Sequence, residues 1–84
     1  MWFVYILECS DKSLYTGITT DVKRRFLEHR NKKGGKYTAS HMPLRIVHQE
    51  KHTSRSAALK RESQIKSWNR SEKISNLRLF KKPG

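Results

Sequence analysis

The segment Trp2–Gly17 most constrains the fold, because it contains two apolar runs separated by a polar turn. The first run, Trp2–Leu7, is continuously apolar and aromatic, so we expect a strand covered on both faces in the middle of a sheet. Polar residues at 10–13 supply the turn, and Leu14–Ile18 returns as the partner strand. Each strand carries a tyrosine, Tyr5 or Tyr15. Taken alone, the two tyrosines are better interpreted as core aromatics than as functional groups.

A helix and a loop are expected after this hairpin. Either Thr20 or Asp21 can cap the helix, which should run to about Lys32 and end before the glycine pair at 34–35. Residues 36–43 have neither a helical nor a strand period, which indicates an exposed basic loop. Gly17 is compatible either with a close backbone approach or with a simple bulge.

The second half of the chain predicts one more strand and two more helices. The strand is expected at Leu44–Glu50, with Leu44, Ile46 and His48 on one face. A helix from about Ser56 to Trp68 should be capped by Thr53 or Ser54, and its apolar face comprises Ala58, Leu59, Ile65 and Trp68. A last helix should be capped by Asn69 or Ser71, with Ile74, Leu77 and Phe80 facing inward. The prediction is therefore an α+β fold, in which about three helices flank a small three-stranded antiparallel sheet.

Length and composition indicate one small basic domain. The 84 residues allow a single domain over 1–80, followed by a flexible tail at 81–84. Nineteen Lys and Arg against seven Asp and Glu give a net charge of +12, which favours a polyanionic partner, with nucleic acid the first candidate. An anionic membrane surface is disfavoured, because no amphipathic helix carries exposed aromatics.

The single cysteine, Cys9, excludes a disulfide within the chain and a thiolate zinc cluster built by one copy. Cys9 also forms no recognisable zinc pattern with His41, His48 and His52. With neither a secretory leader nor a spanning segment expected, we predict a cytoplasmic protein.

Glu62 occupies the middle of the predicted apolar helix face, where a carboxylate is unexpected. From the residues alone, an ion pair with a nearby Lys or Arg is the favoured explanation. The alternative is a ligand for a hard divalent cation such as Mg2+, which takes one or two protein carboxylates together with water and phosphate oxygens.

Arg25 and His29 are four residues apart, so they lie on one line of the first helix beside the core stripe that begins with Val22 and Phe26. They fit an ordinary basic helix face. They also fit a guanidinium that binds a phosphate, with a histidine one turn away that can move a proton. Neither pattern is specific alone, but with the two tyrosines and Glu62 they would surround one phosphodiester.

These residues also carry a family resemblance. The segments VYI at Val4–Ile6 and YTG at Tyr15–Gly17 resemble the paired motifs of the GIY-YIG nuclease superfamily, although Val4 stands where that family has glycine. The expected arginine lies ten residues after Tyr15, the His or Tyr follows one turn later, and a later helix supplies the metal-binding glutamate. Asn76 is a candidate for the asparagine that many members place on the last helix. The chain most resembles the small, stand-alone bacterial UPF0213 group.

The resemblance implies a metal-dependent DNA endonuclease that hydrolyses a phosphodiester with Mg2+ or Mn2+. It implies that Glu62 binds the metal, Arg25 holds the scissile phosphate and Tyr5 helps to activate the attacking water. Tyr15 would orient water or phosphate, and His29 would assist proton transfer or substrate positioning. A phenol titrates near pH 10, so a tyrosine base would need help from Arg25 and the metal.

The expected substrate is DNA recognised by structure or damage, in repair or recombination, because no added specificity segment is expected. Lys23, Arg24, Lys36 and Tyr37 are the candidate substrate contacts, and a monomer without a membrane association is expected. The alternative function is a basic module that binds DNA or RNA without cutting it. Such a module would have no use for a carboxylate among phosphate-binding cations.

Overall fold

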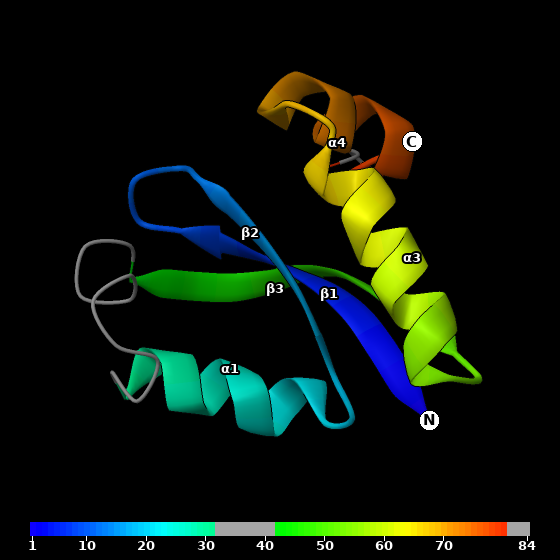
Figure 1. The fold of residues 1–84 in the computed structure, drawn as a ribbon. Coiled ribbons are helices and arrows are strands. Elements are labelled where there is room, and N and C mark those ends of the chain that lie inside the picture. The colour runs from blue at the N-terminus through cyan, green and yellow to red at the C-terminus, as the bar shows by residue number, and fades with distance from the viewer. Residues whose placement is uncertain (32–41, 81–84) are drawn as a thin grey trace.

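The computed structural model describes residues 1–31 and 42–80, and within them it has three strands and three helices. The strands are β1 (Trp2–Cys9), β2 (Leu14–Thr19) and β3 (Pro43–His52). The helices are α1 (Val22–Arg30), α3 (Arg55–Lys66) and α4 (Arg70–Leu77). Figure 1 shows them around one twisted antiparallel sheet with the order β2-β1-β3. The α+β prediction is confirmed, and so is the central position of the first strand.

The β1–β2 hairpin is closed by a short polar turn. Backbone N–H groups of Cys9 and Lys12 donate to the carbonyls of Ser13 and Cys9, and the Asp11 carboxylate accepts from both the backbone N–H and the hydroxyl of Ser13. Lys12 adopts a left-handed backbone conformation, with φ of 70°. The turn sets a continuous register in which each residue of β2 faces a fixed partner on β1.

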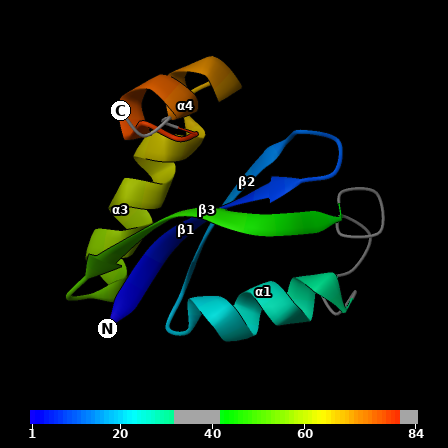
Figure 2. The same ribbon diagram turned by 180° about the vertical axis from the view of Figure 1, so that it is seen from behind.

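The two faces of the sheet are covered by different helices, as Figures 1 and 2 show from opposite sides. On one face, α1 packs against β1 and β3 and closes a core of Tyr5, Leu7 and Val22, with Phe26 and Ile46 beside it. On the other face, α3 packs against all three strands. The core there comprises Val4, Ile6, Leu14, Ala58, Ile65 and Leu79. The alternation along β1 therefore gives the molecule two small cores.

A bulge in β3 makes one sequence prediction wrong. Ile46 pairs with Leu7, but the preceding residue of β1, Ile6, pairs with His48, so Val47 is the extra residue. Directly paired residues lie on the same face of a sheet, so Ile46 faces α1 whereas His48 faces α3. The expectation that Ile46 and His48 share a face fails for this reason. In the sequence, Val47 follows Ile46 directly and interrupts the alternation of apolar and polar residues, which is the pattern expected at a bulge.

Side-chain caps fix where the helices begin. Of the alternatives that the sequence left open, the caps are Asp21 for α1, Ser54 for α3 and Asn69 for α4. Asn69 also forms a capping box, in which the Glu72 side chain accepts from the Asn69 backbone N–H while Asn69 accepts from Glu72. At the other end, α1 stops at Arg30, earlier than the expected Lys32.

Two residues expected to face inward are exposed. Leu59 on α3 is 36% exposed, because the buried face of this helix comprises Ala58 and Ile65. Phe80 is exposed and Leu79 is buried in its place. The cause is Arg78, whose left-handed backbone at φ 54° ends α4. The chain leaves the helical direction at this residue, so Leu79 reaches the core and Phe80 does not. No helix within 1–31 and 42–80 has the length and apolar character needed to cross a membrane.

Candidate active site

Four of the predicted site residues gather on the face of the sheet that α1 covers. Tyr5 comes from β1, Tyr15 from β2, and Arg25 and His29 from α1. The Tyr5 hydroxyl lies 3.5 Å from Nε2 of His29, and the rings of Tyr5 and Tyr15 are 6.2 Å apart between centroids. The Tyr15 and His29 rings meet edge to face at 5.0 Å. Three elements therefore bring two phenols and an imidazole into one cluster.

Gly17 is the position that makes room for this cluster. It pairs directly with Tyr5 in an uninterrupted β1–β2 register, so it does not form a bulge. A Cβ atom at Gly17 would lie 2.7 Å from the Tyr5 hydroxyl, 2.9 Å from Cζ of Tyr5 and 3.2 Å from Cε1 of Tyr15. The Tyr5 ring thus lies across the glycine, and any side chain at position 17 would push the phenol away.

The cluster has a buried layer and a layer that reaches solvent. Tyr5 is 1% exposed and His29 is 4% exposed. Tyr15 and Arg25 are partly exposed and lie above them. A substrate at the surface would therefore meet Tyr15 and Arg25 first, with Tyr5 and His29 behind.

Burial and nearby charges set the protonation of the two buried groups. Burial, and next the neighbouring Tyr15, raise the pKa of Tyr5 above its ordinary value of 10.0, and Arg25 opposes this only in part. Burial, and next the positive charge of Arg25, lower the pKa of His29 below 6.5, although Glu28 opposes this shift. At neutral pH the pair is therefore a neutral phenol and a neutral imidazole, and one ring nitrogen of His29 can accept a proton.

Arg25 connects the cluster to the surface. Its Nη1 donates to Oε1 of Glu28 at 3.2 Å, and its charge acts on both phenols. Burial lowers the pKa of Arg25, but the hydrogen bonds to Glu28 and Tyr5 raise it more, so the guanidinium stays charged. A guanidinium presents five N–H donors in a planar fork, so one ion pair leaves donors for an incoming anion.

Glu62 lies on the helix that covers the other face of the sheet. It lies on α3, which packs against β2, whereas Tyr15 of β2 points toward α1. Its carboxylate is 16% exposed and pairs with the ammonium of Lys66 at 3.2 Å, one helical turn later. The ion pair that the sequence favoured is thus present.

The donor set around Glu62 decides which cation it can hold. No group of three or more His, Cys, Asp or Glu side chains within the described residues is arranged to bind a metal. A single partly buried carboxylate is too few for zinc or a calcium cage. It fits Mg2+, which keeps most of its shell as water and phosphate oxygens, provided that Lys66 gives up the carboxylate.

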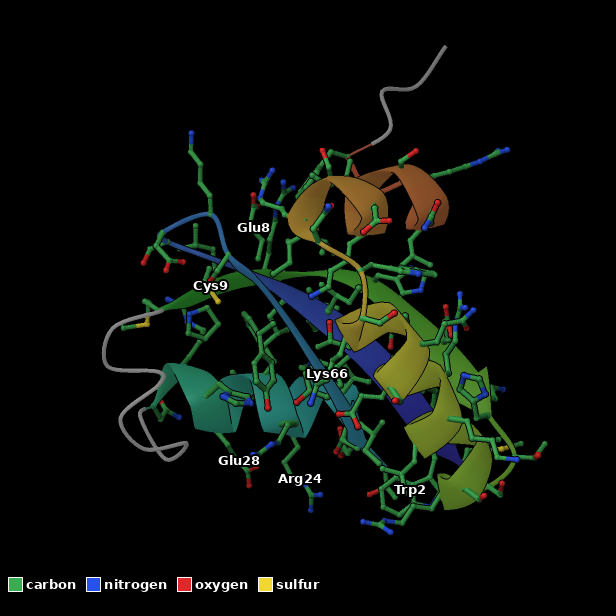
Figure 3. The ribbon with its side chains drawn as sticks, turned by 45° about the horizontal axis from the view of Figure 1, so that its top comes forward. Trp2, Glu8, Cys9, Arg24, Glu28 and Lys66 are labelled. Atoms are coloured by element: carbon green, nitrogen blue, oxygen red, sulfur yellow. The ribbon has the colours of Figure 1, made fainter. Side chains whose placement is uncertain are left out.

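The other predicted substrate contacts lie elsewhere. Lys23 and Arg24 line a shallow depression on the outer surface of α1, together with Asp21, Leu27, Glu28 and Asn31. Figure 3 shows Arg24 and Glu28 pointing away from the sheet. This depression does not include Tyr5, Tyr15 or His29, but it adjoins Arg25 through Glu28. Lys36 and Tyr37 lie outside the described residues, as do His41 and the tail 81–84.

The sequence did not point to a second polar cluster on the α3 face. The Glu50 carboxylate accepts from Arg61 at 3.0 to 3.2 Å, and Nε2 of His48 and of His52 lies 2.8 and 3.2 Å from it. Burial raises the pKa of Glu50, but these hydrogen bonds outweigh it and bring the pKa to about 2. Alternate residues 48, 50 and 52 of a strand share one face, which was the available signal. The cluster ties β3 to α3 and is structural.

The chain is similar in sequence and in fold to known proteins. The family described as the GIY-YIG catalytic domain matches residues 1–75. A UPF0213 protein of Haloquadratum walsbyi is 56% identical over 71 residues, which are 84% of this chain and 80% of that protein. One from Staphylococcus epidermidis is 50% identical over 72 residues, 86% of this chain and 88% of that protein.

A solved structure is also similar. The UPF0213 protein of Bacillus halodurans, determined in solution by NMR, is 42% identical and superimposes with a TM-score of 0.58. The match covers 92% of this chain and 83% of that one. The expected fold and the expected resemblance are both confirmed.

Proposed function

This chain belongs to the GIY-YIG catalytic domain family, and we propose that it is an endonuclease that hydrolyses phosphodiester bonds of DNA with one divalent cation. The observation that carries the proposal is the buried pair of Tyr5 and His29, with 3.5 Å between hydroxyl and Nε2, directly beneath Arg25. A protein that only holds nucleic acid needs surface cations. It has no need of a neutral proton acceptor placed behind one of them.

Arg25 is the group that holds the scissile phosphate in this proposal. It is charged, partly exposed and restrained on one side by Glu28, so its fork is fixed before substrate arrives. Guanidinium–phosphate pairs form two parallel hydrogen bonds, which orient the phosphorus as well as binding it. A guanidinium so placed also stabilises the charge that builds on the phosphate oxygens in the transition state.

The two tyrosines take different roles because their exposures differ. Tyr15 is partly exposed, so its hydroxyl orients the attacking water, whereas Tyr5 is 1% exposed and acts from behind. The raised pKa of Tyr5 means that this phenol works as a proton carrier and not as a standing phenolate. Its proton has a recipient in the neutral imidazole of His29. The bond of 3.5 Å is long and should shorten when substrate closes the site.

Glu62 is the residue that would hold the cation, Mg2+ or Mn2+. When bound, such a cation neutralises phosphate charge and supports the leaving oxygen. Lys66 competes for the same carboxylate at 3.2 Å, so Glu62 remains paired and folded in place without a metal.

The substrate that we propose is DNA recognised by its structure or by damage. The charge of +12 supplies affinity for phosphates of any sequence, and Lys23, Arg24, Lys36 and Tyr37 remain candidate contacts outside the tyrosine cluster. A role in repair or recombination would follow from such a preference.

The test is incubation of the purified protein with plasmid, branched and single-stranded DNA and with RNA, in Mg2+, Mn2+ or EDTA. We expect cutting of at least one DNA with either cation and none in EDTA. Arg25→Ala should reduce the rate by about a hundredfold or more, as loss of one transition-state donor does.

Arg55→Ala is the matched control, because Arg55 stacks over Trp2 at 5.7 Å on the opposite face of the sheet. It removes the same charge and should retain the parent rate. If Arg25→Ala also cuts at the parent rate, the assigned phosphate site is wrong. If the parent binds each nucleic acid but cuts none, the binding-module function replaces the nuclease.

A further inference from the structure

The Glu62 carboxylate has a positively charged neighbour on its own helix. Lys66 reaches the Glu62 carboxylate from the next turn of α3, and its side chain is 55% exposed against 16% for Glu62. Figure 3 labels Lys66 beside α3. Lys66 therefore covers the outer side of the carboxylate that the proposed function assigns to the cation.

Lys73 brings the second positive charge from a different helix. It lies on α4, and its Nζ donates to the carbonyl oxygen of Leu14 at 3.2 Å. That carbonyl belongs to the peptide that joins Leu14 to Tyr15, so the Lys73 ammonium lies next to the backbone of the site tyrosine. Burial, and next the positive charge of Lys66, lower the pKa of Lys73.

Specific contacts hold this pair in place. Nε of Arg70 donates to the Lys12 carbonyl at 2.7 Å, which attaches the first turn of α4 to the β1–β2 turn. With the Lys73 bond to Leu14, α4 is held by two hydrogen bonds to the turn and to the start of β2. A side chain on a helix that is already fixed loses less entropy when it binds a ligand.

The charge balance of the group favours an anion. Lys66 pairs with the Glu62 carboxylate, whereas Lys73 donates to an uncharged carbonyl where β2 begins, so the group carries an excess positive charge. Lys66 can serve either Glu62 or an incoming phosphate, and whatever neutralises Glu62 frees Lys66. Arg25 approaches the same strand from the α1 side.

We propose that Lys66 and Lys73 form a second phosphate-binding site, which holds a phosphate next to the one bound by Arg25 on the cut strand. This inference rests on the proposed function, because it assumes that Arg25 binds the scissile phosphate. The bound strand then crosses the β2 edge from the α1 side to the α4 side, with Glu62 between the two phosphate sites. Lys66 is a substrate-binding residue that stays paired with Glu62 until a phosphate binds.

The test measures binding of a short fluorescent DNA oligonucleotide in EDTA, so that neither cleavage nor a cation contributes. Glu62→Gln removes the competitor for Lys66 and should tighten binding by about two- to fivefold, the range for one exposed ion pair. Lys66→Gln should weaken binding and reduce the slope of log affinity against log salt by about 0.7 to 0.9. In the Lys66→Gln background, Glu62→Gln should give no gain.

Three control variants separate this site from a general charge effect. Glu8→Gln removes a carboxylate that pairs with Arg45 instead, and its gain in affinity should persist in the Lys66→Gln background. Lys60→Gln removes an exposed charge from α3 and should leave the salt slope within error of the parent. Lys73→Arg keeps the cation and should retain binding that Lys73→Gln loses, with the circular dichroism spectrum confirming that both variants fold.

The inference is overturned if Glu62→Gln tightens binding equally with and without Lys66, or if Lys66→Gln and Lys60→Gln change the salt slope equally. Cleavage by Arg25→Ala, measured beside these variants, reports on the proposed function separately. Loss of cleavage in Arg25→Ala without coupling between Glu62 and Lys66 leaves the nuclease and removes the second phosphate site. Coupling without cleavage in the parent leaves the second phosphate site and removes the nuclease.

Discussion

Gly17→Ala is the substitution that most sharply tests how the tyrosine cluster is built. The new Cβ would lie 2.7 Å from the Tyr5 hydroxyl and 2.9 Å from Cζ, distances that a Cβ essentially never adopts. Tyr5 is packed with Leu7 and Val22 and is 1% exposed, so its ring has little room to move aside. The substitution should therefore displace the phenol, strain the α1-side core, or both.

The magnitude follows from two opposing effects. Adding a methyl group to a packed core costs about 1 to 3 kcal/mol. Replacing glycine in a strand by alanine restores about 0.5 to 1 kcal/mol, because the unfolded chain loses less entropy on folding. We expect Gly17→Ala to lower the free energy of unfolding by about 0.5 to 2 kcal/mol and to lower Tm by several degrees.

Urea unfolding followed by circular dichroism measures this loss, and Tyr5→Phe identifies its cause. Tyr5→Phe removes the oxygen at 2.7 Å but keeps the ring carbon at 2.9 Å, so it should relieve part of the cost of Gly17→Ala. The double-mutant cycle should show a coupling of about 0.5 kcal/mol or more. A Gly17→Ala protein as stable as the parent, with no coupling to Tyr5→Phe, would refute the packing described for the site.

Three further predictions concern pH, the β3–α3 contact and salt. The folded state holds the pKa of His29 below 6.5, so the unfolded state binds the proton more readily, and the free energy of unfolding should fall as the pH is lowered from about 7.5 to about 5.5. If the free energy of unfolding of His29→Gln depends on pH as steeply as that of the parent, His29 is not the cause. Glu50→Gln should lower the free energy of unfolding in urea by about 1.5 to 3 kcal/mol, because it weakens the hydrogen bonds of Arg61 to a charged acceptor. Glu8→Gln, whose partner Arg45 is 60% exposed, should lower it by about 1 kcal/mol or less. Equal losses in the two variants would contradict a stabilising role of the contact between Glu50 and Arg61. DNA affinity should fall steeply with added salt, and a nearly flat titration would contradict binding through phosphates.

The elements of the fold were predictable because local sequence signals agreed with the tertiary packing. Asp21, Ser54 and Asn69 stand at the capping positions, and the continuous apolar run of β1 required cover on both faces. The departures arise where the backbone breaks a period. The bulge at Val47 moves His48 to the other face of the sheet. The left-handed backbone at Arg78 places Leu79 in the core, where the helical pattern predicted Phe80.

The candidate site was predictable as a set of residues but not as an arrangement. Sequence spacing placed Arg25 and His29 on one helix line and paired the tyrosines across a hairpin. It could not give the burial of Tyr5, which depends on the packing of α1 over the sheet. The partner of Glu62 was detectable in principle, because Lys66 is four residues away, whereas Lys73 is brought to the site only by the docking of α4.

The most direct measurement of the central claim is the single-turnover cleavage rate of one labelled DNA strand by Glu62→Gln and by Glu8→Gln in Mg2+. Both variants remove one carboxylate charge and keep a side chain of the same shape, and both carboxylates are in ion pairs. We expect Glu62→Gln to lower the rate by about a hundredfold or more, whereas Glu8→Gln should cut as the parent does. Equal rates for the two variants would contradict it, because Glu62 would then contribute no more than a surface charge.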